Sequence, residues 1–158
     1  MKFKLRIPKS NAILDSPTSY NGIQIGKFDS VLLCSSFDLL HPGHIRIMEL
    51  SKMVGKKLII GFNTDPDLKS PVQSVYERWK QVSAIKYVDE ITPYSGDEDL
   101  LKLLRSTDYS VRALGEDYIG KQHAGIEYED TVDIPTIYFD RSHGFSTSEL
   151  RARIKRDY

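Results

Sequence analysis

Residues 31–44 read Val-Leu-Leu-Cys-Ser-Ser-Phe-Asp-Leu-Leu-His-Pro-Gly-His, an apolar run followed by a polar turn and two histidines. The apolar run has the length of a buried strand. Pro42 suits the first turn of a helix, where its missing N–H would be unpaired in any case. The stretch therefore predicts a strand that passes quickly into a helix, with His41 and His44 at the junction.

The same alternation continues on both sides of this junction. Strands are predicted at 30–36, 56–62, 89–94, 110–114 and 136–140. Helices are predicted at 44–55, with Gly55 as its C-cap, at 75–88, at 97–106 and, after a cap, within 142–156. One face of the helix at 75–88 is expected to carry Val75, Trp79, Val82, Ile85 and Tyr87 or Val88. Residues 115–135 read as a long irregular stretch. Strands that alternate with helices predict an α/β fold with a doubly wound, Rossmann-like parallel sheet flanked by helices.

The first 28 residues follow a different pattern. Residues 3–7 alternate as a strand does, and the turn-rich sequence after them suggests a hairpin or an extended segment. We expect residues 1–28 to form an N-terminal arm or hairpin packed on a main domain of residues 29–158.

The composition limits the classes of partner. The 158 residues carry 22 Lys+Arg and 22 Asp+Glu, so no bulk charge attracts nucleic acid or a membrane surface. The single cysteine, Cys34, excludes an internal disulfide and reads as a small buried side chain. No signal peptide or membrane-spanning run is predicted. We expect a cytoplasmic protein without nucleic-acid or membrane partners, and the basic C-terminal helix reads as a solvated helix end.

Polar clusters follow four of the predicted strands, namely SSFD, NTD, LGED and DRSHGFST. In open α/β sheets the carboxyl ends of the strands form the ligand crevice, so these clusters should converge there. At the histidine junction a helix N-terminus attracts phosphate, and Gly43 allows a close approach. The imidazole N–H groups of His41 and His44 could stabilise charge on phosphate oxygens. A metal pair, which would need a third protein ligand, and two surface histidines are the alternatives.

Several motifs in the same order resemble the cytidylyltransferase branch of the HxGH nucleotidyltransferase superfamily, with glycerol-3-phosphate cytidylyltransferases the most similar members. SSFDLLHPGH resembles the histidine signature, and VYERWKQVSAIKYVDEI resembles the ExR helix and the strand entry after it. SVRALGEDYIGK resembles the VMGDDW segment, and DRSHGFSTSELRARI resembles the RTxGISTTxI signature. The resemblance spans about residues 30–156. It departs at Ser35, where the family has glycine, and at Tyr118, where the family has tryptophan.

The resemblance implies transfer of CMP from CTP to a phosphorylated polyol, sugar or alcohol such as glycerol 3-phosphate, with release of pyrophosphate. It implies Mg²⁺ bound with the triphosphate, and a homodimer. Catalytic roles are implied for His41, His44, Arg141 and Lys69. Nucleotide contacts are implied for Ser35, Ser36, Phe37, Asp38, Gly43, Gly115, Ser146 and Thr147. Acceptor contacts are implied for Arg78, Asp117 and Tyr118.

Alternatives accompany several of these roles. Ser146 and Glu149 could simply form a capping box. Lys69 could be a solvated loop lysine, and Arg78 could fasten its helix through a salt bridge. Residues 115–121, GEDYIGK, match the P-loop pattern, but Gln122 stands where a Ser or Thr should bind Mg²⁺. An adenylyltransferase that uses ATP, and a non-catalytic nucleotide-binding module, remain the alternative functions.

Overall fold

The computed structural model describes residues 3–6, 26–65, 67, 70–141 and 144–157. Its strands are β1 (Phe3–Arg6), β2 (Phe28–Ser35), β3 (Gly55–Asn63), β4 (Glu90–Tyr94), β5 (Val111–Gly115) and β6 (Thr136–Phe139). Its helices are α1 (Pro42–Val54), α2 (Val75–Ser83), α3 (Gly96–Ser106), the 3-10 helix η1 (Glu116–Tyr118), α4 (Ile126–Thr131) and α5 (Thr147–Asp157). Among these helices, none is long and apolar enough to cross a membrane.

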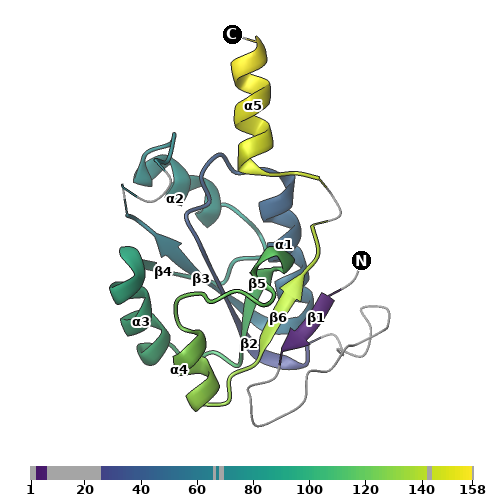
Figure 1. Cartoon of the computed structure of the whole chain (residues 1–158), viewed down its shortest axis with the longest axis vertical. Coiled ribbons are helices and arrows are strands. Elements are labelled where there is room, and N and C mark those ends of the chain that lie inside the picture. Colours follow the sequence, from purple (N-terminus) through teal and green to yellow (C-terminus); the bar gives the residue numbers. More distant parts are fainter. Residues whose placement is uncertain (1–2, 7–25, 66, 68–69, 142–143, 158) are drawn as a thin grey trace.

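The six strands form one sheet in the order β1-β6-β5-β2-β3-β4. The strands from β6 to β4 run parallel, and β1 pairs antiparallel with β6 at one edge (Figure 1). The predicted doubly wound parallel sheet is therefore confirmed. The chain moves outward from β2 to β3 and β4, then crosses back to β5 and β6. The switch point thus lies at the carboxyl ends of β2 and β5, where such sheets bind ligands. Of the predicted N-terminal arm, the structure describes residues 3–6 and 26–28, and Phe28 already begins β2.

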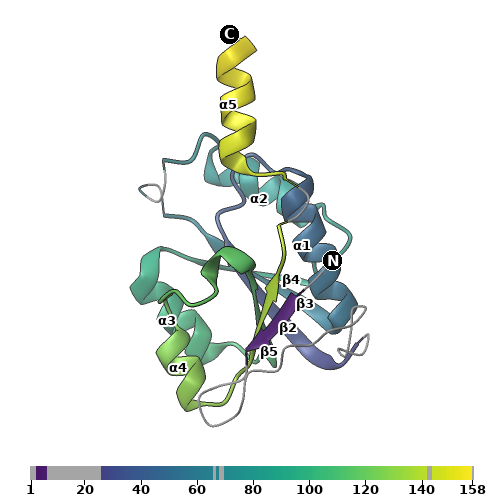
Figure 2. The same cartoon turned by 45° about the vertical axis from the view of Figure 1, so that its right-hand side comes forward.

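Helices cover both faces of the sheet, which explains why the central strands read as unbroken apolar runs. Val31 and Leu33 of β2 pack into a core with α1 and α2. Leu32, between them, points to the opposite face and packs with α3. Figures 1 and 2 show α3 and α4 together on one side of the sheet and α1 on the other.

The buried face of α2 differs from the predicted one. The helix ends at Ser83, and its buried residues are Arg78 and Val82. Val75 and Trp79 were expected in the core, but they are 41% and 43% exposed. A helix can bury only one face, and a buried arginine occupies the place that periodicity assigned to apolar residues. The remaining predicted members, Ile85, Tyr87 and Val88, pack against the core from the turns that follow the helix.

The stretch 115–135, predicted to be irregular, contains η1 and α4. Helix α4 has six residues, too few for a helical period to show in the sequence. It begins after Gly125, whose φ of +94° is a left-handed conformation that favours glycine. Its only buried residue is Glu129, which accepts a hydrogen bond of 2.9 Å from the Tyr109 hydroxyl. A long-range polar contact therefore supports this short helix.

Gly55 caps α1 as predicted, but not through a left-handed backbone. Its φ is −121°, and it is also the first residue of β3. A Cβ at this position would collide with Cγ2 of Val31 on the neighbouring strand β2. Close packing of the two central strands, rather than conformational freedom, explains the glycine.

Candidate functional site

A cavity of about 310 Å³ opens at the carboxyl ends of β2, β5 and β6. It lies at the topological switch point of the sheet, between the first turn of α1 and the N-terminus of α5. The predicted site residues that line it are Ser35, Ser36, Phe37, Asp38, His41, Gly43, His44, Gly115, Tyr118, Arg141, Ser146 and Thr147. Three of the four polar clusters thus converge as expected. From the cluster after β3, Asn63 is buried, and the loop that follows contributes Pro71 to the lining.

The two histidines form a stacked pair at the start of α1. Their ring centroids are 3.8 Å apart, with an angle of 23° between the rings. His41 is the N-cap residue, and its Nδ1 accepts a hydrogen bond from the Gly43 N–H at 3.1 Å. Nδ1 of His44 accepts one from the His41 N–H at 3.4 Å. Because each Nδ1 is an acceptor, each neutral ring carries its proton on Nε2. The helix cap thereby makes Nε2–H the donor group of both rings.

His44 is held in its neutral form. Burial, together with the nearby His41 and Arg141, lowers the pKa of His44 to about 3, against a smaller opposing effect of Asp38. Phe37, which is 1% exposed, meets the His44 ring edge-on with 5.5 Å between centroids. At neutral pH this imidazole is therefore a hydrogen-bond donor and not an acid.

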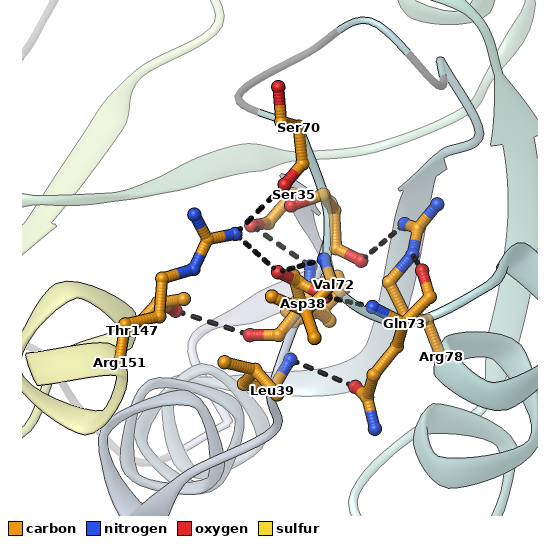
Figure 3. A network of polar contacts seen from close by, with 11 residues as sticks. Ser35, Asp38, Leu39, Ser70, Val72, Gln73, Arg78, Thr147 and Arg151 are labelled. Atoms are coloured by element: carbon orange, nitrogen blue, oxygen red, sulfur yellow. Dashed lines mark hydrogen bonds and ion pairs between the residues drawn. The ribbon is translucent and has the colours of Figure 1, made fainter. Parts of the chain in front are cut away.

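Asp38 joins three segments around the cavity (Figure 3). Its carboxylate accepts hydrogen bonds from the N–H groups of Val72 and Gln73, both at 2.9 Å. It also forms an ion pair of 2.8 Å with Nη2 of Arg151 on α5. Burial alone would raise the pKa of Asp38, but the N–H groups of Gln73 and Val72 and the Arg151 guanidinium hold it below its usual value. Asp38 is therefore an ionised organising residue of the site.

Arg141 and Asp117 meet at the end of β5. Nε of Arg141 lies 3.1 Å from Oδ1 of Asp117, and its backbone N–H donates to Glu116 at 2.8 Å. A Cβ on Gly115 would lie 2.6 Å from the Asp117 carboxylate and 2.9 Å from Arg141 Nε. Position 115 therefore needs a glycine, because any side chain there would collide with the Arg141–Asp117 ion pair. Tyr118 lines the cavity, whereas the described lining does not include Asp117.

The N-terminus of α5 closes another side of the cavity. Oγ of Ser146 accepts a hydrogen bond from the Glu149 N–H at 3.1 Å, as a cap residue does. The Glu149 carboxylate pairs instead with Arg153 on the same helix, at 3.0 Å. Thr147 donates its hydroxyl to the Asp38 carbonyl at 3.2 Å. Both hydroxyls therefore organise the helix start while lining the cavity.

A comparison with known families agrees with this geometry. The sequence pattern of the family described as Cytidylyltransferase-like matches residues 32–153, from β2 into α5. The chain belongs to the cytidylyltransferase-like family. The matched range contains every predicted site residue, and the family is one of nucleotidyltransferases.

Named relatives of this cytidylyltransferase-like chain are bifunctional proteins. It is 31% identical over 126 residues to the bifunctional protein HldE of Campylobacter fetus, covering 75% of this chain and 26% of that protein. It is 29% identical over 128 residues to HldE of Helicobacter pylori, covering 77% of this chain and 27% of that protein. The chain thus spans about a quarter of the length of the curated relatives that it matches. These relatives do not bear out the expected similarity to glycerol-3-phosphate cytidylyltransferases in particular.

A solved structure shares the fold. The crystal structure of the lipopolysaccharide core biosynthesis protein from Thermoplasma volcanium GSS1 superposes with a TM-score of 0.52 at 22% identity. The match covers 82% of this chain and 88% of that one. It supports the Rossmann-like arrangement of the sheet and its helices.

The predicted acceptor residue Arg78 of this cytidylyltransferase-like protein lies outside the described cavity lining. Arg78 was expected to contact the acceptor, but it is 1% exposed and is absent from the described cavity lining. Its Nη1 donates to the carbonyls of Ser36 at 2.7 Å and Asn63 at 2.8 Å. This favours the alternative that Arg78 fastens its helix, through backbone carbonyls rather than a salt bridge. Lys69 lies outside the described residues, so its role stays a prediction.

The sequence analysis missed two arginines of the site. Arg46 of α1 lines the cavity and pairs with Glu49 at 2.7 Å. Arg151 also lines it, although it was read as part of a solvated basic helix end. No local signal distinguishes Arg151 from Arg153, since its partner Asp38 lies 113 residues away in the sequence.

The described residues contain no group of three or more His, Cys, Asp or Glu side chains that could hold a metal ion. The carboxylates of Asp38 and Asp117 are each bound by an arginine. These donors do not fit a metal cage made by the protein. A Mg²⁺ that arrived on a triphosphate would keep mainly phosphate and water ligands, as this cation commonly does, and would need no such cage.

Proposed function

We propose that this member of the cytidylyltransferase-like family transfers a nucleoside monophosphate from a nucleoside triphosphate to a phosphorylated small molecule. CTP is the expected donor, and the acceptor is a polyol, sugar or alcohol phosphate. The observation that carries the proposal is the stacked His41–His44 pair, which lines one cavity with Arg141 and the N-terminus of α5. Histidines that donate hydrogen bonds, a guanidinium and helix N–H groups all suit a polyphosphate ligand.

The proposed reaction needs no general base. An oxygen of the acceptor phosphate, already an anion, attacks the α-phosphorus of the triphosphate. The new P–O bond forms as the bond between the α-phosphorus and the bridging oxygen breaks, and pyrophosphate leaves. Negative charge grows on the α-phosphate oxygens and on the leaving group. Neutral Nε2–H donors at His41 and His44 can stabilise that charge without transferring a proton.

The negative charge of the triphosphate would be balanced by a metal ion and by side chains of the cavity. Magnesium bound to the triphosphate would neutralise part of its charge when it enters the cavity. Arg141 would add a fixed guanidinium charge, at the expense of its pairing with Asp117. Ser146 and Thr147 would keep the first turn of α5 directed at the β- and γ-phosphates. The homodimer and the cytoplasmic location also stay proposals.

Measuring pyrophosphate release tests the proposal. CTP or ATP with Mg²⁺ is offered together with a panel of polyol, sugar and alkyl phosphates. We expect release with CTP, and we expect His44→Ala to lower turnover by about 100-fold or more, as loss of a transition-state donor does. Lys102→Ala, on the outer surface of α3, is the matched control and should keep full activity.

The two alternatives give different results in the same assay. The curated relatives named above are HldE proteins, so ATP is the second donor to test. Release with ATP alone would replace the cytidylyltransferase by an adenylyltransferase. Saturable nucleotide binding without release across the whole panel would contradict the enzymatic proposal and favour a binding module.

A further inference from the structure

Helix α5 extends away from the rest of the molecule (Figures 1 and 2). Within Thr147–Asp157, all of which the structure describes, no residue is buried. Its docking therefore cannot rest on a hydrophobic face of the kind that holds α1 and α3 in place. The polar contacts of Thr147 and Arg151 with Asp38 join the first half of α5 to the loop after β2.

Arg151 holds two segments with one nitrogen atom. Its Nη2 lies 2.8 Å from Oδ2 of Asp38 and 3.1 Å from the carbonyl oxygen of Ser70 (Figure 3). Asp38 in turn binds the N–H groups of Val72 and Gln73, so the loop 70–73 is attached to α5 both directly and through Asp38.

The backbone around Asp38 needs such support. Phe37 and Leu39, on either side of it, have φ angles of +52° and +50°, and Ser70 has +43°. Side-chain-bearing residues adopt this left-handed region rarely and keep it only where surrounding contacts hold them there. Leu39 is held further by a hydrogen bond of 2.9 Å from its N–H to the Gln73 side chain.

The charge of Asp38 also needs compensation. Its carboxylate lies on the lining of the cavity in which we place a polyphosphate. An unpaired carboxylate there would repel the ligand, and Arg151 supplies the opposing charge at hydrogen-bond distance. Leu150 and Ala152, its neighbours in α5, could not replace either contact.

We infer that Arg151 is a positioning residue of the nucleotide site. Through Asp38 and Ser70 it fixes the first turn of α5 and the loop 70–73 against the histidine turn, so that the Ser146–Ser148 hydroxyls and the phosphate-binding histidines face one ligand. The inference rests on the proposed function only in naming that ligand a triphosphate. The residue itself touches no reacting atom.

Three variants test this role. Arg151→Gln removes the charge and Arg151→Lys restores it on a shorter, non-planar group. Arg153→Gln is the matched control, because Arg153 is an exposed arginine of α5 whose ion pair within the described part of the chain is with Glu149 of the same helix. The readouts are KM and kcat for the nucleotide, the melting temperature, and hydrogen exchange of the amides in 72–74 and 146–150.

We expect Arg151→Gln to raise KM for the nucleotide about 10-fold with a smaller change in kcat, since it weakens ground-state and transition-state binding alike. Exchange should accelerate about 10-fold in both segments. Arg151→Lys should recover part of each effect, and Arg153→Gln should leave both unchanged. A lowered melting temperature with unchanged KM and unchanged exchange in 72–74 would overturn the inference.

The exchange measurement separates this inference from the proposed function. If the wild-type chain releases no pyrophosphate with any donor, the proposed function fails, yet exchange in 72–74 and 146–150 still reports the coupling. The double variant Asp38→Asn with Arg151→Gln should then accelerate exchange by less than the two single variants combined, because both single variants remove the same ion pair, while only Arg151→Gln also removes the contact with Ser70. Additive effects would contradict the inference.

Discussion

His44 combines burial with a polar task. Its Nδ1 completes the helix cap, and its Nε2–H is the group that can meet a phosphate. The stacked His41 ring and the neighbouring Arg141 discourage a positive charge on His44, and burial discourages it most. A neutral donor at this place keeps its hydrogen bond through the whole neutral range of pH.

This leads to a prediction about stability and pH. The pKa of His44 is about 3 in the folded chain against 6.5 for an exposed histidine, so protonation favours unfolding. The contribution of the neutral His44 to the free energy of unfolding is fully present above about pH 6.5 and is lost as the pH falls toward 3. We measure the free energy of unfolding in urea at about pH 7.5 and at about pH 5. Between these two values, the free energy of unfolding of the wild type should fall by roughly 1–2 kcal/mol more than that of His44→Asn. The asparagine oxygen keeps the cap acceptor but does not titrate. Equal losses in both proteins would show that His44 is not the destabilising group.

Arg78 shows how a charged side chain can organise a helix. It lies at the start of α2, and its guanidinium bonds to carbonyls at the ends of β2 and β3 and, through Nε, to the Gln73 carbonyl at 3.3 Å. The same guanidinium lies over the Phe62 ring, 5.2 Å from its centroid. Helix α2 and the loop before it are thereby held to the strand ends that carry the histidine turn.

Replacing Arg78 should therefore cost stability first. Arg78→Lys leaves at least one of the three carbonyl acceptors without its donor, and each such loss at a buried acceptor costs about 1–3 kcal/mol. We expect the free energy of unfolding in urea to fall by about 2 kcal/mol, with KM for the acceptor unchanged in the protein that remains folded. Lys80→Ala, on the exposed side of α2, is the control. A raised acceptor KM with full stability would instead support direct acceptor binding.

Across the whole molecule, the two faces of the sheet are held together differently. The face with α1 and α2 carries an apolar core that ends at the cavity. The face with α3 and α4 encloses a buried polar cluster in which Arg112 lies 3.5 Å from Glu129 and donates to the Ala124 carbonyl at 2.7 Å. Tyr109 donates its hydroxyl to the same glutamate. This cluster fastens the segment 115–135, and with it Tyr118, to the sheet.

Breaking this cluster on one side should destabilise the chain severely. Glu129→Gln would leave the buried charge of Arg112 uncompensated, which typically costs about 3–5 kcal/mol. Replacing both residues, in Arg112→Leu with Glu129→Leu, should recover much of that loss, because no charge then remains buried. Urea unfolding of Arg112→Leu, of Glu129→Leu and of the double variant measures this. A double variant as unstable as the sum of the single ones would contradict a compensated ion pair.

Local sequence patterns were sufficient to predict the architecture and much of the candidate site. The run VLLC and its counterparts have strand length, the helical segments have their own period, and HPGH marks the junction at the switch point. Those features are short in sequence, so periodicity and turn chemistry reveal them. The histidine pair was predicted from this junction, and Arg141, Ser146 and Thr147 were predicted from the family resemblance; all of them line one cavity.

Other features appeared only in the folded arrangement. The Asp38–Arg151 pair, the buried Arg78 and the Arg112–Glu129 pair join residues that are distant in sequence. From sequence alone, a charged residue on a helix is predicted to be exposed to solvent. Its partners on neighbouring strand ends and loops become visible only in the folded structure. The helical period also placed Trp79 on the buried face of α2, but Arg78 is buried there instead. The period of the apolar residues predicts the buried face only when no polar residue of the helix is buried in their place. Such contacts depend on the order of the strands in the sheet and on how each helix packs against it. No short stretch of sequence determines either of these.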